Sequence, residues 1–164
     1  MKTNPNNITK RSFSPILGFD IGGTKAAVIL GTLRGRILDR ISEPSHANQG
    51  PKRMILRLVE MGKTLLQRNQ LRYSNISGIG ISCGGPLDLK KGIVLSPPNL
   101  PGWDNIPIKR IIQNAFQAQT FLENDANAGA LAEYYWGGGK GKNNIIYMTM
   151  GTGIGGGIIL DGKL

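Results

Sequence analysis

The sequence predicts an α/β fold built on a mixed β-sheet. Three short apolar segments come first, separated only by glycine-bearing turns, and this pattern is typical of an antiparallel meander. After them, segments with helical spacing alternate with short apolar segments, as in parallel strands joined by helices. The expected order is three strands, then helix, strand, helix, strand and helix (βββαβαβα), followed by one further hairpin.

The three opening strands are expected at residues 16–21, 26–30 and 36–41, with turns at Gly22-Gly23 and at 33–35. A helix is expected between residues 51 and 72, because apolar side chains recur there every three or four positions. These side chains are Met54, Ile55, Leu58, Val59, Met61, Leu65 and Leu66. The basic residues of the segment fall mostly away from that stripe and are interpreted as a solvated face: Lys52, Arg53, Arg57, Lys63 and Arg68.

The second half of the chain continues the alternation. A strand over residues 76–83 ends at Gly84-Gly85-Pro86, and residues 90–92 are expected to turn a hairpin. Three prolines between residues 96 and 104 predict an irregular loop. The other expected elements are a helix at 108–116, a strand at 120–123, a helix at 126–136, a flexible joint at 137–144, and strands at 145–150 and 157–160.

Composition excludes several classes of protein. No stretch approaches the roughly 18 apolar residues of a membrane span, and residues 1–15 lack the apolar block of a signal peptide, so we expect a cytoplasmic protein with no membrane partner. The single cysteine, Cys83, cannot form an internal disulfide or a thiolate metal cluster, and it is expected to be a small core residue. The only histidine, His46, lies in a polar stretch and is expected in a solvated loop.

The formal net charge of +10 is unevenly distributed. Residues 1–72 hold 13 Lys and Arg and 4 Asp and Glu, whereas residues 73–164 hold 7 and 6. No aromatic residues interleave with the basic ones, and no zinc-finger or helix-turn-helix pattern accompanies them. Specific nucleic-acid binding is therefore not expected.

The first segment that carries chemistry is GFDIGGTK, at the turn between the first two strands. Gly22 and Gly23 let the backbone approach an anion and direct N–H groups at it, while Thr24 adds a hydroxyl donor and Lys25 a cation. Asp20 offers an oxygen to a hydrated divalent cation. An ordinary Gly-Gly hairpin turn is the alternative for this motif alone, and the spacing does not match GxxxxGK[ST].

A second glycine-rich segment, GTGIGGG, follows the strand expected at 145–150. It matches GxGxxG, but a dinucleotide-binding loop must open a helix, and residues 155–160 are three glycines and an apolar, partly β-branched run. A β-hairpin that exposes backbone amides to phosphate fits better. A mobile glycine linker is the alternative.

The third segment, LENDANAGALAEYYWGG, spans a junction from strand to helix. In a purely structural interpretation Asp125 is the helix N-cap. In a functional one, its carboxylate faces the crevice at the carboxyl end of the strand and accepts a proton from a substrate hydroxyl. Glu123 is expected to point to the opposite face and to be structural.

These segments, in this order, resemble the N-terminal half of ROK-family bacterial sugar kinases, which include many glucokinases and belong to the actin-like ATPase superfamily. GFDIGGTK is similar to the family's first phosphate loop, CGGPLD to the strand end beside the sugar, and PNLPGW to the sugar loop. ENDANAGALAE is similar to the catalytic segment and GTGIGGGII to the second phosphate loop. The resemblance covers about residues 16–160. It implies an actin-like ATPase (ribonuclease H-like) lobe and ATP-dependent phosphorylation of a hexose or N-acetylhexosamine.

The resemblance also implies roles for individual residues at the sugar. Asp125 would bind the sugar and act as the general base that activates its hydroxyl group. Asn99 and Asn124 would form hydrogen bonds with the sugar. Gly84 and Gly85 would lie against the sugar ring.

For the nucleotide, the resemblance implies that Asp20 helps to position Mg²⁺ through water, and that both glycine-rich loops bind the phosphates of ATP. The residues implied in phosphate binding are Gly22, Gly23, Thr24, Lys25, Gly151, Thr152, Gly153, Gly155 and Gly156. No zinc site is expected in these 164 residues, because the family's Cys-rich cluster has no counterpart here.

The expected organisation is an N-terminal tail at 1–15, a sugar-kinase lobe at 16–138, and a joint with the start of a second lobe at 139–164. In the family the chain continues with a Glu-x-Gly-His sugar segment and the adenine pocket, which are absent from these residues. We therefore expect the 164 residues alone not to phosphorylate sugar at a meaningful rate. Unless the last hairpin folds back or pairs with another chain, we also expect its apolar residues to be partly exposed: Ile145, Ile146, Tyr147, Ile158, Ile159 and Leu160.

Two other functions stay open at this point. The family also contains sugar-sensing repressors, but only 15 residues precede the first expected strand, too few for a helix-turn-helix, and this favours the kinase. A catalytically inactive fragment is the second alternative. Assembly into a homo-oligomer is left open.

Overall fold

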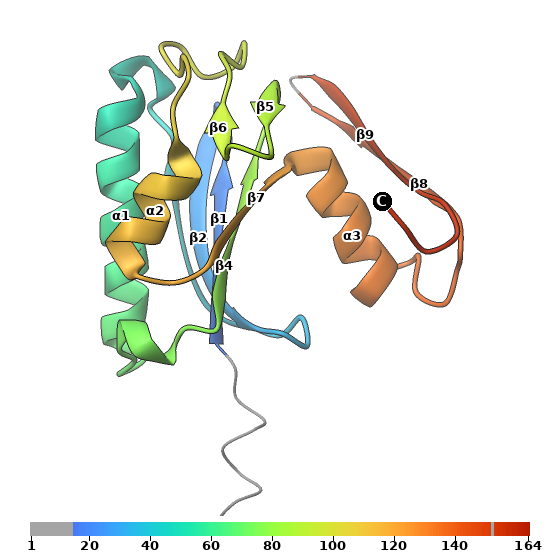
Figure 1. Cartoon of the computed structure of the whole chain (residues 1–164), viewed down its shortest axis with the longest axis horizontal. Coiled ribbons are helices and arrows are strands. Elements are labelled where there is room, and N and C mark those ends of the chain that lie inside the picture. Colours follow the sequence, from blue (N-terminus) through green and yellow to red (C-terminus); the bar gives the residue numbers. More distant parts are fainter. Residues whose placement is uncertain (1–14, 152) are drawn as a thin grey trace, which may run out of the picture.

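A five-stranded mixed sheet forms the centre of the structure, a computed structural model that describes residues 15–151 and 153–164 (Figure 1). The strand order is β3-β2-β1-β4-β7. β1 pairs antiparallel with β2 and β2 with β3, whereas β1, β4 and β7 run parallel. The strands are β1 (Pro15–Ile21), β2 (Lys25–Thr32), β3 (Ile37–Pro44), β4 (Gly78–Cys83) and β7 (Thr120–Asn124). The predicted meander and the predicted parallel strands therefore share one sheet, and the predicted tail lies almost wholly outside the described residues.

Two helices, α1 (Pro51–Arg68) and α2 (Ile108–Phe116), cover one face of this sheet (Figure 1). The apolar stripe predicted for α1 is buried, apart from the partly buried Val59. The helix ends at Arg68, four residues earlier than expected, because Gln70 takes a left-handed conformation with φ +55° and the Leu71 amide returns to the Leu66 carbonyl.

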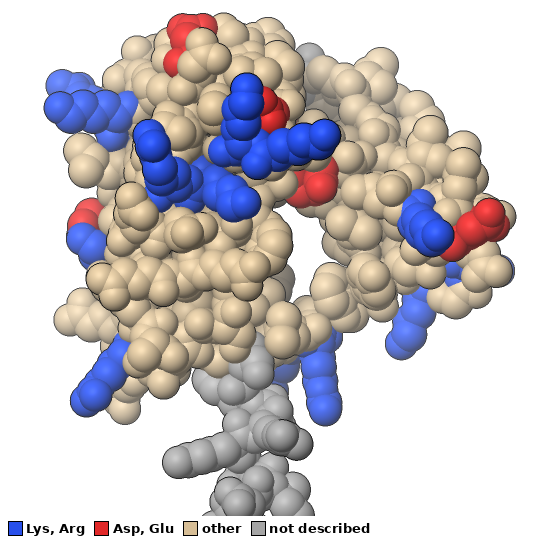
Figure 2. Space-filling view, viewed as in Figure 1, with Lys and Arg blue, Asp and Glu red and all other residues tan. Residues whose placement is uncertain are grey.

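Most of the basic residues of α1 form the expected solvated face. Lys52, Arg53, Lys63 and Arg68 are exposed, and Figure 2 shows basic side chains along the left edge, where α1 lies. Arg57 differs from the expectation, because its guanidinium donates to the Ser45 carbonyl and to Gln49 Oε1. Among the described residues, none of the helices is long and apolar enough to cross a membrane.

On the other side of the sheet, α3 (Asp125–Trp136) packs against a hairpin of β8 (Ile145–Met150) and β9 (Ile154–Ile159) (Figure 1). Glycines permit this contact. A Cβ atom at Gly157 would lie 2.6 Å from the Ala126 carbonyl oxygen, and one at Gly129 would lie 2.5 Å from the Tyr147 ring. β9 begins at Ile154 and not at residue 157 as expected, because Gly155 and Gly156 also belong to the strand, and Gly155 packs on α3 beside Ala126.

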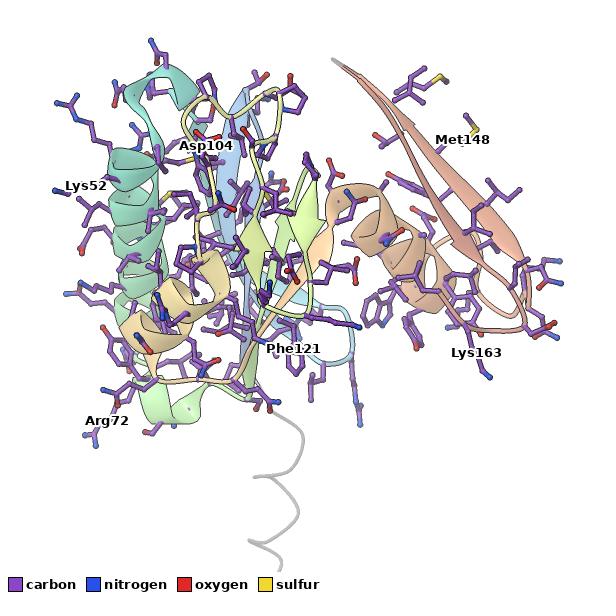
Figure 3. The ribbon with its side chains drawn as sticks, turned by 45° about the horizontal axis from the view of Figure 1, so that its top comes forward. Lys52, Arg72, Asp104, Phe121, Met148 and Lys163 are labelled. Atoms are coloured by element: carbon purple, nitrogen blue, oxygen red, sulfur yellow. The ribbon has the colours of Figure 1, made fainter. Side chains whose placement is uncertain are left out.

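The two faces of this hairpin have opposite environments. Ile159 is fully buried, because the hairpin folds back on α3, the alternative to partial exposure that was left open. Ile146, Ile158 and Leu160 are 73%, 53% and 62% exposed, and Met148 points away from α3 (Figure 3). Only the outer face of the hairpin therefore lacks a partner among the described residues.

The remaining elements are short. β5 (Leu87–Asp88) and β6 (Ile93–Val94) form the expected hairpin around residues 90–92, and single 3₁₀ turns occur at η2 (Ala47–Gln49) and η3 (Tyr73–Asn75). Because η3 intervenes, β4 starts two residues later than expected. The loop at 96–104 has no helix or strand, and its buried Leu100 and Trp103 anchor it to the core.

Cys83 provides a chemical test of this core. Its side chain is buried as expected, and this burial, with the nearby carboxylates of Asp125 and Asp20, raises the pKa of the thiol to about 12. The thiolate is the reactive form, so we expect almost no reaction with a disulfide reagent in the native chain near pH 8, and one equivalent after unfolding. Rapid modification of the native chain would show that β4 is not packed as described.

Candidate functional site

The parallel strands bring three chain segments to one edge of the sheet. Ile21, Cys83 and Asn124 are aligned across β1, β4 and β7, so these strands end at the same level. Gly22, Gly84 and Asp125 therefore follow directly at this edge. In open α/β sheets the carboxyl ends of parallel strands are where ligands bind.

A cleft of about 380 Å³ lies at this edge. Most of the predicted site residues line it: Gly22, Gly23, Gly84, Gly85, Asn99, Asn124, Asp125, Gly151, Gly153 and Gly155. The structure thus places the predicted sugar residues and parts of both predicted phosphate loops around one cavity.

The cleft has further lining residues that were not named singly as site residues: Ile21, Pro97, Pro98, Leu100, Thr149 and Ile154. Of these, Pro97 and Thr149 lie outside the quoted motifs. Thr149 is the polar one of these. Residue alternation along β8 gives the available signal, because Ile145, Tyr147 and Thr149 share the face that is turned toward α3.

Some predicted residues do not line this cleft. Thr24 and Lys25 are exposed beside it, and Gly156 lies on the outer face of the hairpin opposite Met148. Asp20 lies on the face of the sheet that is turned toward α3, next to Ser82 of β4. Thr152 is outside the described residues.

Backbone amides in the two glycine loops are partly engaged. The Gly22 amide donates to the Lys25 carbonyl at 3.1 Å, and the Gly151 amide donates to the Gly153 carbonyl at 2.9 Å. These two amides close turns and so do not point at a ligand, contrary to the expectation for Gly22. Gly23 has another role, because a Cβ atom there would lie 2.6 Å from the carbonyl oxygen of Asn99. Its missing side chain lets the loop that carries Asn99 pack directly on the turn.

Asn124, and not Asp125, is the N-cap of α3. The Asn124 Oδ1 atom accepts the amides of Ala126 and Asn127 at 3.0 and 3.3 Å. Asp125 is the first helical residue, and its Oδ1 accepts the Ala126 amide at 2.8 Å. The interpretation of Asp125 as a simple N-cap is therefore wrong, because its neighbour already performs that function.

This arrangement fixes what each side chain offers to a ligand. The oxygen of Asn124 is occupied by two amides, so its Nδ2 group remains as a donor, 3.6 Å from the position of a Cβ at Gly85. The second oxygen of Asp125, Oδ2, lies 3.8 Å from the position of a Cβ at Gly84. The cleft thus presents a hydrogen-bond donor beside a carboxylate oxygen that can accept a proton.

Glu123 supports this site from behind. Its Oε1 accepts the Asn124 amide at 2.9 Å and the Asn127 Nδ2 group at 3.0 Å. The side chain does not line the cleft and lies on the α3 side of the sheet with Asp20. The expectation that Glu123 points to the opposite face and is structural agrees with this position.

The surroundings of Asp20 shift the pKa of its carboxyl group. Burial raises the pKa of Asp20 above its usual 3.8 and the Asp125 carboxylate raises it further, while Arg40 and Ser82 act in the opposite direction. A bound cation would offset the repulsion by which the Asp125 carboxylate raises the pKa of Asp20. Oxygen donors suit Mg²⁺, which takes one or two carboxylates and keeps several water molecules. Asp20 therefore fits the water-mediated magnesium role that the resemblance implies.

The raised pKa of Asp20 gives a prediction for stability. A carboxyl group whose pKa is higher in the folded chain than in the unfolded chain makes the folded state less stable as the pH rises through these values. We therefore expect Asp20→Asn to raise the Tm at about pH 7, with the gain shrinking toward about pH 4. Thermal unfolding followed by circular dichroism measures it, and a lower Tm for the variant at neutral pH would contradict this description of Asp20.

A larger hollow, of about 750 Å³, lies elsewhere on the sheet. It is formed by the last turns of α2 and the start of β7, between Lys109 and Phe121. None of the predicted site residues lines it, and it lies at the amino end of β7, away from the edge where the three parallel strands end. The volume of this hollow is not by itself evidence of a binding or catalytic function.

Comparison with known proteins agrees with this geometry. The ROK family model matches residues 16–164. The glucokinase of Thermotoga maritima is 35% identical over 149 residues, which are 91% of this chain and 45% of that protein. The xylose repressor of Caldicellulosiruptor bescii is 31% identical over 91% of this chain and 37% of its own length. The chain thus spans less than half the length of these relatives.

A solved structure confirms the fold. The ROK glucokinase of Streptomyces griseus, in complex with glucose and AMPPNP, matches with a TM-score of 0.81 and 32% identity. The match covers 92% of this chain and 46% of that one. The expected actin-like ATPase fold is thereby confirmed, and the chain belongs to the ROK family.

Proposed function

We propose that this chain is the sugar-binding and catalytic part of an ATP-dependent hexose kinase of the glucokinase type. One observation carries the proposal. The Nδ2 donor of Asn124 and the second carboxylate oxygen of Asp125 face one cleft, whose other walls are glycine turns. This combination provides a donor and a base for a hydroxyl group, with room for the backbone to approach phosphate.

In the proposed reaction a sugar lies against Gly84 and Gly85, where no side chain blocks the ring. Asn124 donates a hydrogen bond to one sugar oxygen, and Asn99 bonds to another. Asp125 Oδ2 accepts the proton of the attacking hydroxyl as the oxygen bonds to the γ-phosphorus of ATP. Phosphoryl transfer depends mainly on such positioning and on charge neutralisation.

The nucleotide side of the cleft is formed by the two glycine turns. Mg²⁺, held by Asp20 through water, would neutralise charge on the phosphates. Backbone amides of the turn at 23–25 and of the hairpin at 153–156 would bind the phosphate oxygens, because the Gly22 and Gly151 amides are engaged within the turns. We propose that the enzyme works in the cytoplasm, where ATP is available.

A regulator remains the second candidate, because the chain is also 31% identical to a xylose repressor. A repressor needs to bind sugar but has no need for a base. The two candidates therefore differ in whether Asp125 matters for turnover or only for binding. The sugar itself is also open between a hexose and an N-acetylhexosamine.

Replacing Asp125 with Asn separates these functions. We expect sugar binding to stay within about tenfold, because the amide keeps the shape of the side chain, whereas turnover falls by about 10² to 10⁴ through loss of the base. The assay uses a chimera in which residues 16–164 replace the matching part of the Thermotoga maritima glucokinase, since the 164 residues alone are not expected to phosphorylate sugar at a meaningful rate.

ADP release by this chimera is measured with glucose, N-acetylglucosamine, N-acetylmannosamine and fructose. Sugar-dependent release that Asp125→Asn abolishes is the expected result, and the preferred sugar identifies the substrate. A folded chimera that binds sugar but releases no ADP supports the regulator. An Asn variant that keeps more than about a tenth of the rate excludes Asp125 as the base.

Asn124 allows its structural and ligand-binding roles to be tested separately. Serine keeps an oxygen that caps α3 but has no amide donor, so we expect Asn124→Ser to lose little stability and to bind sugar about tenfold more weakly. Asn124→Ala loses the cap as well, which costs about 1 kcal/mol in the free energy of unfolding. Calorimetry with glucose and chemical unfolding measure both effects. Unchanged sugar affinity in the serine variant would contradict the proposed donor.

A further inference from the structure

Ser45, between β3 and α1, is a buried polar residue that no part of the proposed reaction uses. Its side chain is only 1% exposed. Its hydroxyl donates to the Gly23 carbonyl, and its own amide donates to the Thr24 carbonyl at 2.9 Å. One residue therefore binds two consecutive carbonyl groups of the predicted first phosphate loop.

These two bonds fix the direction of the neighbouring amides. In a trans peptide the C=O and N–H groups point in opposite directions, and the only cis peptide among the described residues is Gly85–Pro86. Since the carbonyls of Gly23 and Thr24 face Ser45, the N–H groups of Thr24 and Lys25 must point away from it. Thr24 and Lys25 are both exposed residues beside the cleft.

Ser45 is itself held by α1. The Arg57 guanidinium donates to the Ser45 carbonyl, and a second nitrogen of the same group donates to Gln49 Oε1 at 3.1 Å. These contacts explain why Arg57 leaves the solvated face that its neighbours Arg53 and Lys52 share. The turn is thereby connected through Ser45 to a helix that is anchored in the core.

We infer that Ser45, braced by Arg57, is a positioning residue that presents the Thr24 and Lys25 amides to the phosphates of the nucleotide. This inference rests on the proposed function, because it assigns these amides to a phosphate-bearing ligand. The inference does not use the Gly22 amide, because this amide closes the turn and is not available to the phosphates. Ser45 touches no substrate in this arrangement and acts only through the turn.

The test follows AMPPNP with Mg²⁺ by ¹H–¹⁵N NMR on the 164-residue chain. In the wild type we expect the Thr24 and Lys25 amide resonances to shift on titration. Ser45→Ala should weaken AMPPNP binding about three- to tenfold, as expected for the loss of one positioning hydrogen bond, while glucose affinity stays within about twofold. Ser45→Thr keeps the hydroxyl and should restore nucleotide binding, and Arg57→Ala should resemble Ser45→Ala.

Exposed neighbours provide matched controls. Ser42→Ala on β3 and Arg53→Ala on α1 remove the same chemical groups from solvated positions and should leave both affinities unchanged. Thermal unfolding of every variant shows whether it is folded. If Ser45→Ala does not fold, Ser45→Thr and Arg57→Ala carry the comparison.

The outcomes separate the two proposals. If the 164-residue chain, which lacks the adenine pocket, binds no AMPPNP, the titration is repeated with the chimera. Absence of AMPPNP binding by the folded chimera would overturn the proposed nucleotide site and this inference with it. Binding that leaves the Thr24 and Lys25 amides unshifted, or that Ser45→Ala and Arg57→Ala do not weaken, overturns the inference alone. Equal losses of glucose and AMPPNP affinity would show a general structural role and would also overturn it.

Discussion

The shared register of β1, β4 and β7 is the constraint on which the rest of this structure depends. Because Ile21, Cys83 and Asn124 are aligned, the three strands end together and deliver their following residues to one edge. A shift of one residue in any strand would turn its side chains to the other face of the sheet. Asp125 would then no longer face the glycine turns, and the cleft would have no acid–base group.

Close glycine contacts bring the walls of the cleft together at this edge. Gly23 lets the Asn99 loop pack against the first turn, while Gly157 and Gly129 let the β8–β9 hairpin pack against α3. All three glycines are points of close approach, and Gly23 is in addition a turn residue. Larger side chains at these positions would separate the walls of the cleft before any ligand could bind.

Much of this architecture could be predicted from the sequence, because the spacing of apolar residues reflects which side of each helix or strand is buried. The stripe of α1, the helix of α2 and the strand β8 follow directly from which positions are apolar. Element boundaries that depend on local geometry could be predicted less well from the sequence. The start of β9 depends on packing of glycines against α3, and the end of α1 on the left-handed conformation of Gln70.

The site shows the same division. Resemblance and loop chemistry identified most of the residues that line the cleft, including Asn99, Asn124 and Asp125. The sequence could not show which of two adjacent polar residues caps α3, because Asn and Asp are equally good caps. It also assigned Arg57 to solvent, since its bond to Ser45 joins residues whose contact depends on how β3 leads into α1.

The central claim is that the cleft at the strand ends binds the sugar, and NMR titration of the chain with glucose tests it most directly. The account predicts saturable shifts of the Gly84 and Gly85 amides and of the Asn124 side-chain NH₂ group. Residues around the larger hollow, such as Gln113 and Phe121, should not respond. Saturable shifts confined to that hollow, or no shifts at all from a folded chain, would contradict the account.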